Sequence, residues 1–543
     1  MNKKFLLACL GLTFFLILFS FNKINLPTAD IGRHIVNGDA FLHSASYGIS
    51  KTELLHTNLF SYTHPDFPFI NHHWGSGILI YLTYILFGFS GLSLIYFLLI
   101  LGAFIFVFIL MRDDADLDVL FLTSIFLIPL IAGRTEVRPE GLSYFFLAFF
   151  TYILYRYSKN PEGKNTSYGA GKIPEKILWL LPISELIWVN THIYFIFGPF
   201  LIGMFLGEEI ILRNWQKVKK LSLILGASII AMFISPYGLK GTLYPFTIFQ
   251  NYGYRIVENQ SISFLENISF INPEFLWYKI TLFFVLATSL FVIIKYREKF
   301  LWTLTGISLT FAVLAYLGIR HIPAFALFSL PLLVYNLTII KKILQEKIKI
   351  NIDPEWQKIL YGLFFVIIIS ITMVHFSTKL PWNKNFGLGI DQNTLAPIEF
   401  IKNNNIHGPF FNNYDIGGFM IFGLYPARNA SGIADAGGPK EKVFVDNRPE
   451  AYPKEFFENI YIPMQEDDKV WQEENKKEKF NAIFFQRLDY TPWAQKFLLE
   501  RIKDPLWAPV FVDSQTIIFL SRNKENVEII KKYELPKNMF QTK

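Results

Sequence analysis

Apolar and polar residues alternate along this chain in long blocks. A membrane-spanning helix needs about 20 mostly apolar residues, and runs of about this length are separated by short polar connections. The runs cover residues 5–22, 89–111, 117–133, 139–157, 176–190, 193–212, 221–236, 275–295, 300–318, 322–340 and 358–376. This pattern predicts a polytopic α-helical membrane protein with about eleven transmembrane helices.

The connection between the first two runs, residues 23–88, is long enough to contain structure of its own. Its last part, from Trp74 to Gly88, is apolar but short, and it follows a stretch rich in His and Pro. We predict that this part is a helix lying in the membrane interface.

The chain changes character after residue 376, where charged residues return and short β-rich runs alternate with helical patterns. The predicted strands are 442–445, 482–485, 510–512 and 516–520, and the predicted helices are 395–403 and 493–502. We therefore predict two domains, a transmembrane domain over residues 1–376 and a soluble α/β domain over residues 377–543.

The composition agrees with this organisation. Hydrophobic residues make up 52% of the chain, charged residues only 17%, and the mean hydropathy is +0.32, which excludes a soluble globular protein of this length. The net charge of +7 comes largely from Lys and Arg in short connections, where membrane topology explains them better than nucleic-acid binding does. Cys9 is the single cysteine, so no internal disulfide can form.

The positive charges also predict an orientation, because Lys and Arg in short loops favour the cytoplasm. They gather in alternate connections, at 3–4, 156–172, 213–220, 295–299 and 341–349. We predict a multi-pass protein of the plasma (inner) membrane with a cytoplasmic amino terminus, an uncleaved first helix and an extracytoplasmic C-terminal domain.

With this orientation, the unusual polar residues converge on the outer face. Six of the ten histidines lie between His34 and His73. The candidate site residues are Asp30, Arg33, His34, His72, His73, Trp74, Arg134, Arg138, Asn190, His192, Arg320 and His321. Such a cluster at a membrane surface suits a substrate that is half lipid and half polar, such as a lipid phosphate carrying a sugar. Positive charge would hold the phosphate while a carboxylate, for which Asp30 is well placed, activates an acceptor hydroxyl.

Short motifs are spread over nearly the whole chain in a defined order. They are Asp30-Ile-Gly-Arg-His34, Asn58-Leu-Phe-Ser-Tyr62, His72-His-Trp74, Arg138-Pro139, Trp188-Val-Asn-Thr-His192, Ser235-Pro-Tyr-Gly238, Arg320-His-Ile-Pro323, Tyr414-Asp-Ile-Gly-Gly418 and Val445-Asp-Asn-Arg448. In this order the sequence resembles the GT-C class of integral-membrane glycosyltransferases. It is most similar to a bacterial branch related to the lipid A aminoarabinose transferases and the protein O-mannosyltransferases.

The resemblance implies transfer of a sugar, with inversion, from a polyprenyl-phosphate donor to an extracytoplasmic glycan, lipid or protein. It implies that Asp30 is the catalytic base or positions the acceptor. The expected partners are the lipid-linked donor, the acceptor and the bilayer, without nucleic acid and without a cofactor. Two positions differ from the characterised enzymes: Ile31 stands where a second acid is usual, and His72-His73-Trp74 replaces a His-Pro-Pro or Lys-Pro segment.

Each candidate residue also has a structural interpretation. Asp30 could cap a helix through Arg33, and Arg33 with His34 could pair with Asp30 or Asp39, or contact lipid headgroups. His72 and His73 are adjacent and no acid or Cys cluster completes a shell, so a metal is not indicated, and Trp74 is typical of an interfacial anchor.

The remaining candidates have structural alternatives as well. Arg134 and Arg138 could pair with the neighbouring acids Glu136 and Glu140. For Asn190 and His192 the alternatives are helix capping or inter-helix hydrogen bonds, and Arg320 with His321 could reach toward the membrane interface. For Asp446 and Arg448 a structural ion pair is favoured. For the whole protein the alternative function is a transporter, a flippase or an inactive membrane scaffold.

Overall fold

The protein is described here from a computed structural model. It describes residues 3–112, 114–134, 136–159, 173–248, 250–348, 386–425 and 441–540, together with five residues between 362 and 370 and the short strands β2 (Ala427–Arg428) and β3 (Ala434–Asp435). The predicted span 358–376 lies largely outside the described residues.

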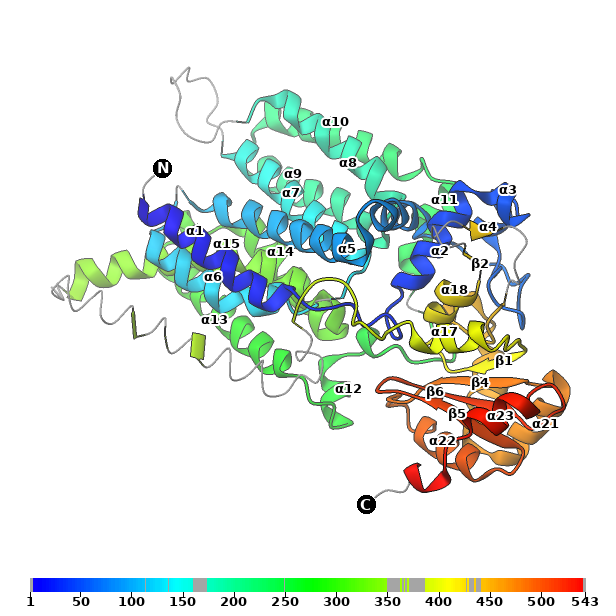
Figure 1. The fold of residues 1–543 in the computed structure, drawn as a ribbon. Coiled ribbons are helices and arrows are strands. Elements are labelled where there is room, and N and C mark those ends of the chain that lie inside the picture. The colour runs from blue at the N-terminus through cyan, green and yellow to red at the C-terminus, as the bar shows by residue number, and fades with distance from the viewer. Residues whose placement is uncertain are drawn as a thin grey trace.

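Long apolar helices form a bundle in which most members lie side by side (Figure 1). They are α1 (Lys3–Ser20), α5 (Trp74–Leu110), α6 (Leu117–Ile131), α7 (Glu140–Ser158), α8 (Leu180–Val189), α9 (Phe197–Ile211), α10 (Trp215–Met232), α13 (Pro273–Lys295), α14 (Trp302–Leu317) and α15 (Ile322–Ile348). Helices therefore cover every predicted span up to 322–340.

Four helical segments in the described part of the chain are long and apolar enough to cross a membrane: Trp74–Leu110, Ile193–Ile211, Pro273–Lys295 and Ile319–Glu346. Three shorter apolar helices, Cys9–Ser20, Leu117–Ile131 and Trp302–Leu317, accompany them. The chain is thus an integral membrane protein.

Helix α5 is bent at Gly88, where the short apolar stretch was expected to end. Gly88 has φ 63° and ψ −164°, a conformation that side-chain-bearing residues avoid. The helical stretch before Gly88 is therefore a separate arm, as the sequence predicts, and the longer stretch after it belongs to the bundle.

The loop after α1 folds into three short helices, α2 (Ile31–Leu42), α3 (Ser44–Tyr47) and α4 (Lys51–His56), at one end of the bundle (Figure 1). α2 approaches α5 closely: a Cβ on Gly38 would lie 2.1 Å from the carbonyl oxygen of Gly77. Because neither residue has a side chain, the two backbones can pack at this distance.

The C-terminal segment, residues 386–540, contains a four-stranded sheet beyond the same end of the bundle (Figure 1). Its strand order is β1 (Phe410–Asn412), β4 (Ala482–Gln486), β6 (Thr516–Ser521) and β5 (Trp507–Val512). β1 pairs with β4 in parallel, and the other neighbours are antiparallel. The predicted strands 482–485, 510–512 and 516–520 are confirmed. The predicted strand 442–445 is wrong, because Val443 makes only an isolated bridge to Ser61.

Helices cover both faces of this sheet. On one face, α17 (Ala396–Asn403) and α18 (Gly417–Leu424) pack on the strands, with the Phe419 ring 6.1 Å from Phe484. On the other face are α21 (Asp468–Glu478) and α22 (Ala494–Lys503), where Trp471 lies 5.0 Å from Phe411. The two faces belong to different apolar clusters, and the α18 face is continuous with the core of the bundle.

The first loop and the C-terminal segment are joined by direct contacts. Tyr62 Oη donates a hydrogen bond to the Phe410 carbonyl at 2.9 Å, and Asn58 Nδ2 donates to the Ala451 carbonyl at 2.9 Å. α18 packs against α2. Two parts of the chain that carry separate sequence motifs are therefore assembled into one junction.

Candidate functional site

Asp30 stands at the N-cap position directly before α2, but its side chain does not cap the helix. Its Oδ1 instead accepts a hydrogen bond of 2.5 Å from Nδ2 of Asn447, in the C-terminal segment. Its Oδ2 lies 3.8 Å from the Arg33 guanidinium, and the side chain is 24% exposed. The carboxylate is thus held from one side and accessible from another.

Arg33 binds the other atom of the same Asn447 amide group. Its buried Nε donates a hydrogen bond of 3.2 Å to Oδ1 of Asn447. Burial and the charge of Arg448 lower the pKa of Arg33. Asp39, the other acid considered as a partner of Arg33, instead accepts a hydrogen bond from Tyr47 and contacts His43.

Four predicted histidines form a buried row that starts on α2. The His34 ring lies 5.3 Å from His73, and His73 lies 3.8 Å from His72 and 5.5 Å from His192, measured between ring centroids. Burial lowers the pKa of His34 and His73 well below 6.5, and that of His72 to about 3. These three rings are therefore neutral at neutral pH. Both ring nitrogens of His34 are buried without a hydrogen-bond partner in the described structure.

The row continues through Tyr194 to the last pair of candidates. The Tyr194 ring is 4.7 Å from His192 and 5.1 Å from His321, and its Oη lies 2.9 Å from His321 Nδ1. His192 also caps η2 (Ile193–Ile196) and lies 2.7 Å from Ser143 Oγ. Asn190 donates to the carbonyls of Leu186 and Ile234, so capping and inter-helix bonding are the observed contacts of these two residues.

Three predicted arginines converge on a single carboxylate, Glu258. Nη2 of Arg134 lies 2.9 Å from Glu258 Oε2, Nη2 of Arg320 lies 3.1 Å from the same atom, and Arg138 pairs with Oε1. Arg138 also contacts Glu136 at 2.5 Å and Arg134 contacts Glu140 at 3.5 Å, as the structural interpretation of this pair expects. Glu258, from the short turn η4 (Val257–Asn259), is the shared partner.

The electrostatics of this cluster favour an anion at the place of Glu258. Burial opposes ionisation of Glu258, but Arg134, Arg138 and Arg320 outweigh it and hold the pKa of the carboxyl well below its usual value. Arginine forks match phosphate as well as carboxylate. The position therefore suits an anionic group, and the Glu258 carboxylate fills it in this structure.

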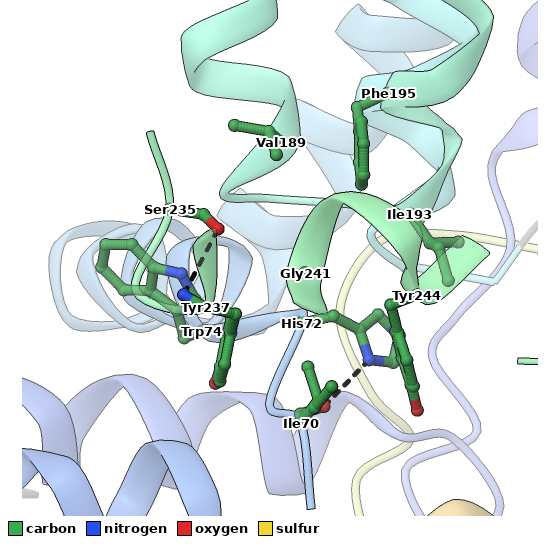
Figure 2. Close-up of a pocket in the computed structure, with 10 residues that line it drawn as sticks. All are labelled: Ile70, His72, Trp74, Val189, Ile193, Phe195, Ser235, Tyr237, Gly241 and Tyr244. Atoms are coloured by element: carbon green, nitrogen blue, oxygen red, sulfur yellow. Dashed lines mark hydrogen bonds between the residues drawn. The ribbon is translucent and has the colours of Figure 1, made fainter. Parts of the chain in front are cut away.

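A pocket lies beside the histidine row, where His72 and Trp74 face Tyr237 and Tyr244 (Figure 2). The pocket is narrow, and part of it is open to the outside. The His72 ring is held by a 3.2 Å contact between Nδ1 and the Ile70 carbonyl. The other lining residues are Val189, Ile193, Phe195, Ser235 and Gly241, so the pocket is mostly apolar, and Asp30 is not among its lining residues.

Sequence reasoning missed Asn447, Glu258 and Asp415 as members of the site. Burial and the charges of Asp489 and Asp30 raise the pKa of Asp415 to about 7, which places this acid within electrostatic reach of Asp30. Asp415 and Asn447 lie within two of the motifs, whereas Glu258 lies outside them, and only the fold brings the three residues to Asp30 and the arginines.

Two acids outside these clusters, Asp446 and Glu185, are also buried. The Asp446–Arg448 pair is structural as expected, with Arg448 Nε donating to Asp446 Oδ1 at 2.8 Å and Nη2 donating to Asn58 at 2.7 Å. Glu185 in α8 is fully buried as well, and its carboxylate has no partner in the described structure. Among the described residues, no group of three or more His, Cys, Asp or Glu side chains is arranged to hold a metal ion.

Comparison with known proteins gives a structural match. No protein-family model and no curated protein matches the sequence. The fold is similar to archaeal oligosaccharyltransferase AglB from Archaeoglobus fulgidus. A complex with an inhibitory peptide and a dolichol-phosphate has a TM-score of 0.56 at 11% identity, covering 96% of this chain and 74% of AglB. A form tethered by a disulfide to an acceptor peptide containing the NVT sequon has a TM-score of 0.59, with the same identity and coverage.

AglB has a GT-C fold. This chain has the GT-C fold too. The match confirms the fold expected from the motif order, and it extends over the bundle and the C-terminal segment because it covers 96% of the chain. Within this GT-C fold, Asp30, the histidine row and the arginine cluster form a connected polar region at the junction of the two parts.

Proposed function

We propose that the protein is a glycosyltransferase that moves a sugar from a polyprenyl-phosphate donor to an acceptor outside the cytoplasm. The observation that carries this proposal is the joint presence, in a GT-C fold, of a partly exposed Asp30 carboxylate and a three-arginine anion site. AglB, which shares the fold, was captured with dolichol-phosphate and with an acceptor peptide. These ligands support a lipid-linked donor and a separate acceptor for this chain.

The reaction would proceed by direct displacement. The acceptor oxygen forms a bond to C1 of the sugar while the bond from C1 to the phosphate oxygen breaks, and the polyprenyl phosphate leaves with the electron pair. The proton of the acceptor group passes to Asp30. Attack from the face opposite the phosphate inverts the configuration at C1. No redox cofactor is required because no oxidation state changes.

Arg134, Arg138 and Arg320 would hold the donor phosphate, whose negative charge grows as the bond to C1 breaks. Positive groups that are already in position stabilise this charge without further reorganisation. Since Glu258 fills the anion position in this structure, the phosphate would take its place beside the three guanidinium groups. Glu258 is carried by the single turn η4 and not by a long helix, so it can move without unfolding the bundle.

The apolar wall of the narrow pocket in Figure 2 would lie against the first part of the lipid chain. Its wall at Tyr237, Gly241 and Tyr244 belongs to a segment that also exposes Leu239, Leu243 and Phe246. Exposed apolar side chains of this kind suit contact with acyl chains or an isoprenoid. His72 and Trp74 would then lie near the boundary between the lipid and its phosphate.

The test is sugar transfer by the purified full-length protein in detergent or nanodiscs. Radiolabelled polyprenyl-phosphate hexoses serve as donors, and the envelope extract of the source cell serves as the acceptor mixture. We expect transfer by the wild type and a loss of at least about 100-fold in Asp30→Asn, because removal of a general base costs about this much.

The matched control is Asp66→Asn, which alters an exposed acid of the same loop and should leave transfer unchanged. Equal transfer by Asp30→Asn and the wild type would remove Asp30 from the mechanism. Flux of the lipid-linked sugar across proteoliposomes without any glycosylated product would contradict the enzyme and support a flippase.

A further inference from the structure

The contact between Asp30 and Asn447 joins two segments that are 417 residues apart in sequence. From this contact we infer that Asn447 is a positioning residue for Asp30, so that the C-terminal segment completes the catalytic centre of the membrane bundle. The inference rests on the proposed function, in which Asp30 acts as the base.

Asn447 links two charged partners of opposite sign, and each of its two amide atoms suits only one of them. Its Nδ2 donates to the Asp30 carboxylate at 2.5 Å, and its Oδ1 accepts from Arg33 Nε at 3.2 Å. A carboxylate cannot donate and a guanidinium cannot accept, so the orientation of the amide is determined. An amide side chain is the group that satisfies both partners at once.

The hydrogen bond fixes one oxygen of Asp30 and leaves the other for chemistry. Within the described structure, Oδ1 is engaged by Asn447, whereas Oδ2 has only the longer contact of 3.8 Å to Arg33. A base works when it is held within hydrogen-bond reach of the proton that it accepts. Holding Oδ1 determines the direction in which Oδ2 faces the acceptor.

Asn447 is itself held by rigid neighbours. The residue before it, Asp446, is fully buried, accepts from Arg448 and donates its backbone N–H to Tyr452 Oη at 2.9 Å. Arg448 is bonded in turn to Asn58 in the first loop at 2.7 Å. The loop that carries Asn447 is therefore tied to the same part of the chain as Asp30.

A close approach of two helices sets the distance between Asn447 and Asp30. A Cβ on Gly32 in α2 would lie 2.7 Å from the carbonyl oxygen of Gly418 in α18. A Cβ on Gly417 would lie 2.3 Å from the Val445 carbonyl oxygen. These glycines let α2, α18 and the loop with Asn447 pack backbone against backbone.

The experiment compares Asn447→Asp, Asn447→Ala and the wild type in the transfer assay. Asn447→Asp keeps the size of the side chain and the acceptor for Arg33 but removes the donor to Asp30 and adds a like charge beside it. We expect kcat to fall about 100-fold in Asn447→Asp and about 10-fold in Asn447→Ala, because a small misplacement of a reacting group has effects of this size. The KM for the donor should stay within about twofold of the wild type, because Asn447 does not contact the proposed phosphate or lipid sites.

Two further measurements separate positioning from a general structural role. The acidic limb of the pH–rate profile should move upward by about one pH unit in Asn447→Asp, because a like charge disfavours an ionised carboxylate. Carbodiimide-dependent labelling of Asp30 with glycine ethyl ester, read by mass spectrometry, should be faster in Asn447→Ala than in the wild type. Asn475→Asp, which adds the same charge on α21, should behave as the wild type in all assays.

A wild-type rate and pH profile in Asn447→Asp would overturn the inference, as would unchanged labelling of Asp30 in Asn447→Ala. If the wild-type protein transfers no sugar, the proposed function fails. The labelling comparison then tests by itself whether Asn447 orients Asp30. Faster labelling in Asn447→Ala would still support the contact that orients Asp30.

Discussion

His34 illustrates how far single side chains in this site depart from ordinary behaviour. It is completely buried and both of its ring nitrogens are without partners in the described structure. Buried polar groups of this kind lower stability by about 1–3 kcal/mol. Such groups in native proteins often mark functional positions, and His34 lies one turn from Asp30 and in ring contact with His73.

His34 should make the protein less stable in acid. Because burial lowers its pKa well below 6.5, the unfolded chain takes up a proton below about pH 6.5 and the folded chain does not. The free energy of unfolding should therefore fall as the pH drops below 6.5, by up to about 1.4 kcal/mol per pH unit for each such group. His34→Phe should raise the melting temperature relative to the wild type, and by more at pH 5.5 than at pH 7.5.

Thermal unfolding in detergent at both pH values measures this difference. His43→Phe is the control, because His43 is partly exposed and contacts Asp39. A melting-temperature difference between His34→Phe and the wild type that does not change with pH would contradict the account.

At the residue scale, the sequence predicts acids and bases by position but does not reveal their partners. Asp30 could be chosen because it follows the first apolar run directly. Asn447 could not, because amides carry no catalytic signature and the Asp30 contact spans 417 residues. Glu258 lies in a loop without regular pattern, and only the fold brings three arginines to it.

At the scale of elements, helix α2 is packed between two others. It meets α5 at Gly38 and Gly77, and it meets α18 at Gly32 and Gly418. Because the contacts are made by backbone, a single added methyl group can change the spacing of the elements.

Gly32→Ala should be destabilising by about 1–3 kcal/mol, the usual effect of overpacking. The new Cβ would meet the Gly418 carbonyl oxygen at 2.7 Å and Phe422 Cβ at 2.8 Å, so α2 and α18 must separate. Separation would also pull Asn447 from Asp30, so transfer should fall more than stability alone explains. Denaturation midpoints and transfer rates, measured on the same preparation, test both effects.

Gly418→Ala is the matched control on the other side of the same contact. Its Cβ would lie 3.4 Å from Asn447 Nδ2 and 3.6 Å from the Ala29 carbonyl oxygen, which is ordinary van der Waals contact. It should leave the denaturation midpoint of the wild type unchanged. If Gly32→Ala and Gly418→Ala lowered the denaturation midpoint equally, the spacing between α2 and α18 would not explain the loss of stability.

Elements with a strong periodic signal could be predicted, and short ones could not. Apolar runs indicated the bundle helices, and Gly88 ends the arm of α5 where expected. β1 has only three residues, too few for a pattern. Residues 442–445 look like a strand because Val443, Phe444 and Val445 are apolar and β-prone, but Val443 instead bridges to Ser61 and joins the C-terminal segment to the first loop.

At the scale of the molecule, the bundle and the C-terminal segment meet at one end, next to α2, α3 and α4 (Figure 1). The proposed orientation places this end outside the cytoplasm, with the short turn η5 (Arg297–Lys299) on the inner side. The orientation rests on the positive charges of the inner connections.

Impermeant maleimide labelling of single-cysteine variants tests this orientation. In a Cys9→Ser background, Asp66→Cys in the first loop and Lys524→Cys in the C-terminal segment should be labelled in intact spheroplasts. Glu298→Cys in η5 should be labelled only after the membrane is opened. All three positions are exposed, so access and not burial decides the result. If only Glu298→Cys were labelled in intact spheroplasts, the topology would be the reverse of the proposed one. This result would contradict a reaction outside the cytoplasm.

The link between Asn447 and Asp30 also affects how the protein matures. The ribosome releases α2 early, while the loop with Asn447 emerges only after the bundle helices have been synthesised. A nascent chain therefore carries Asp30 at the membrane surface without the amide that orients it. With the proposed function, efficient sugar transfer would begin only after the loop with Asn447 has been synthesised and has packed against α2.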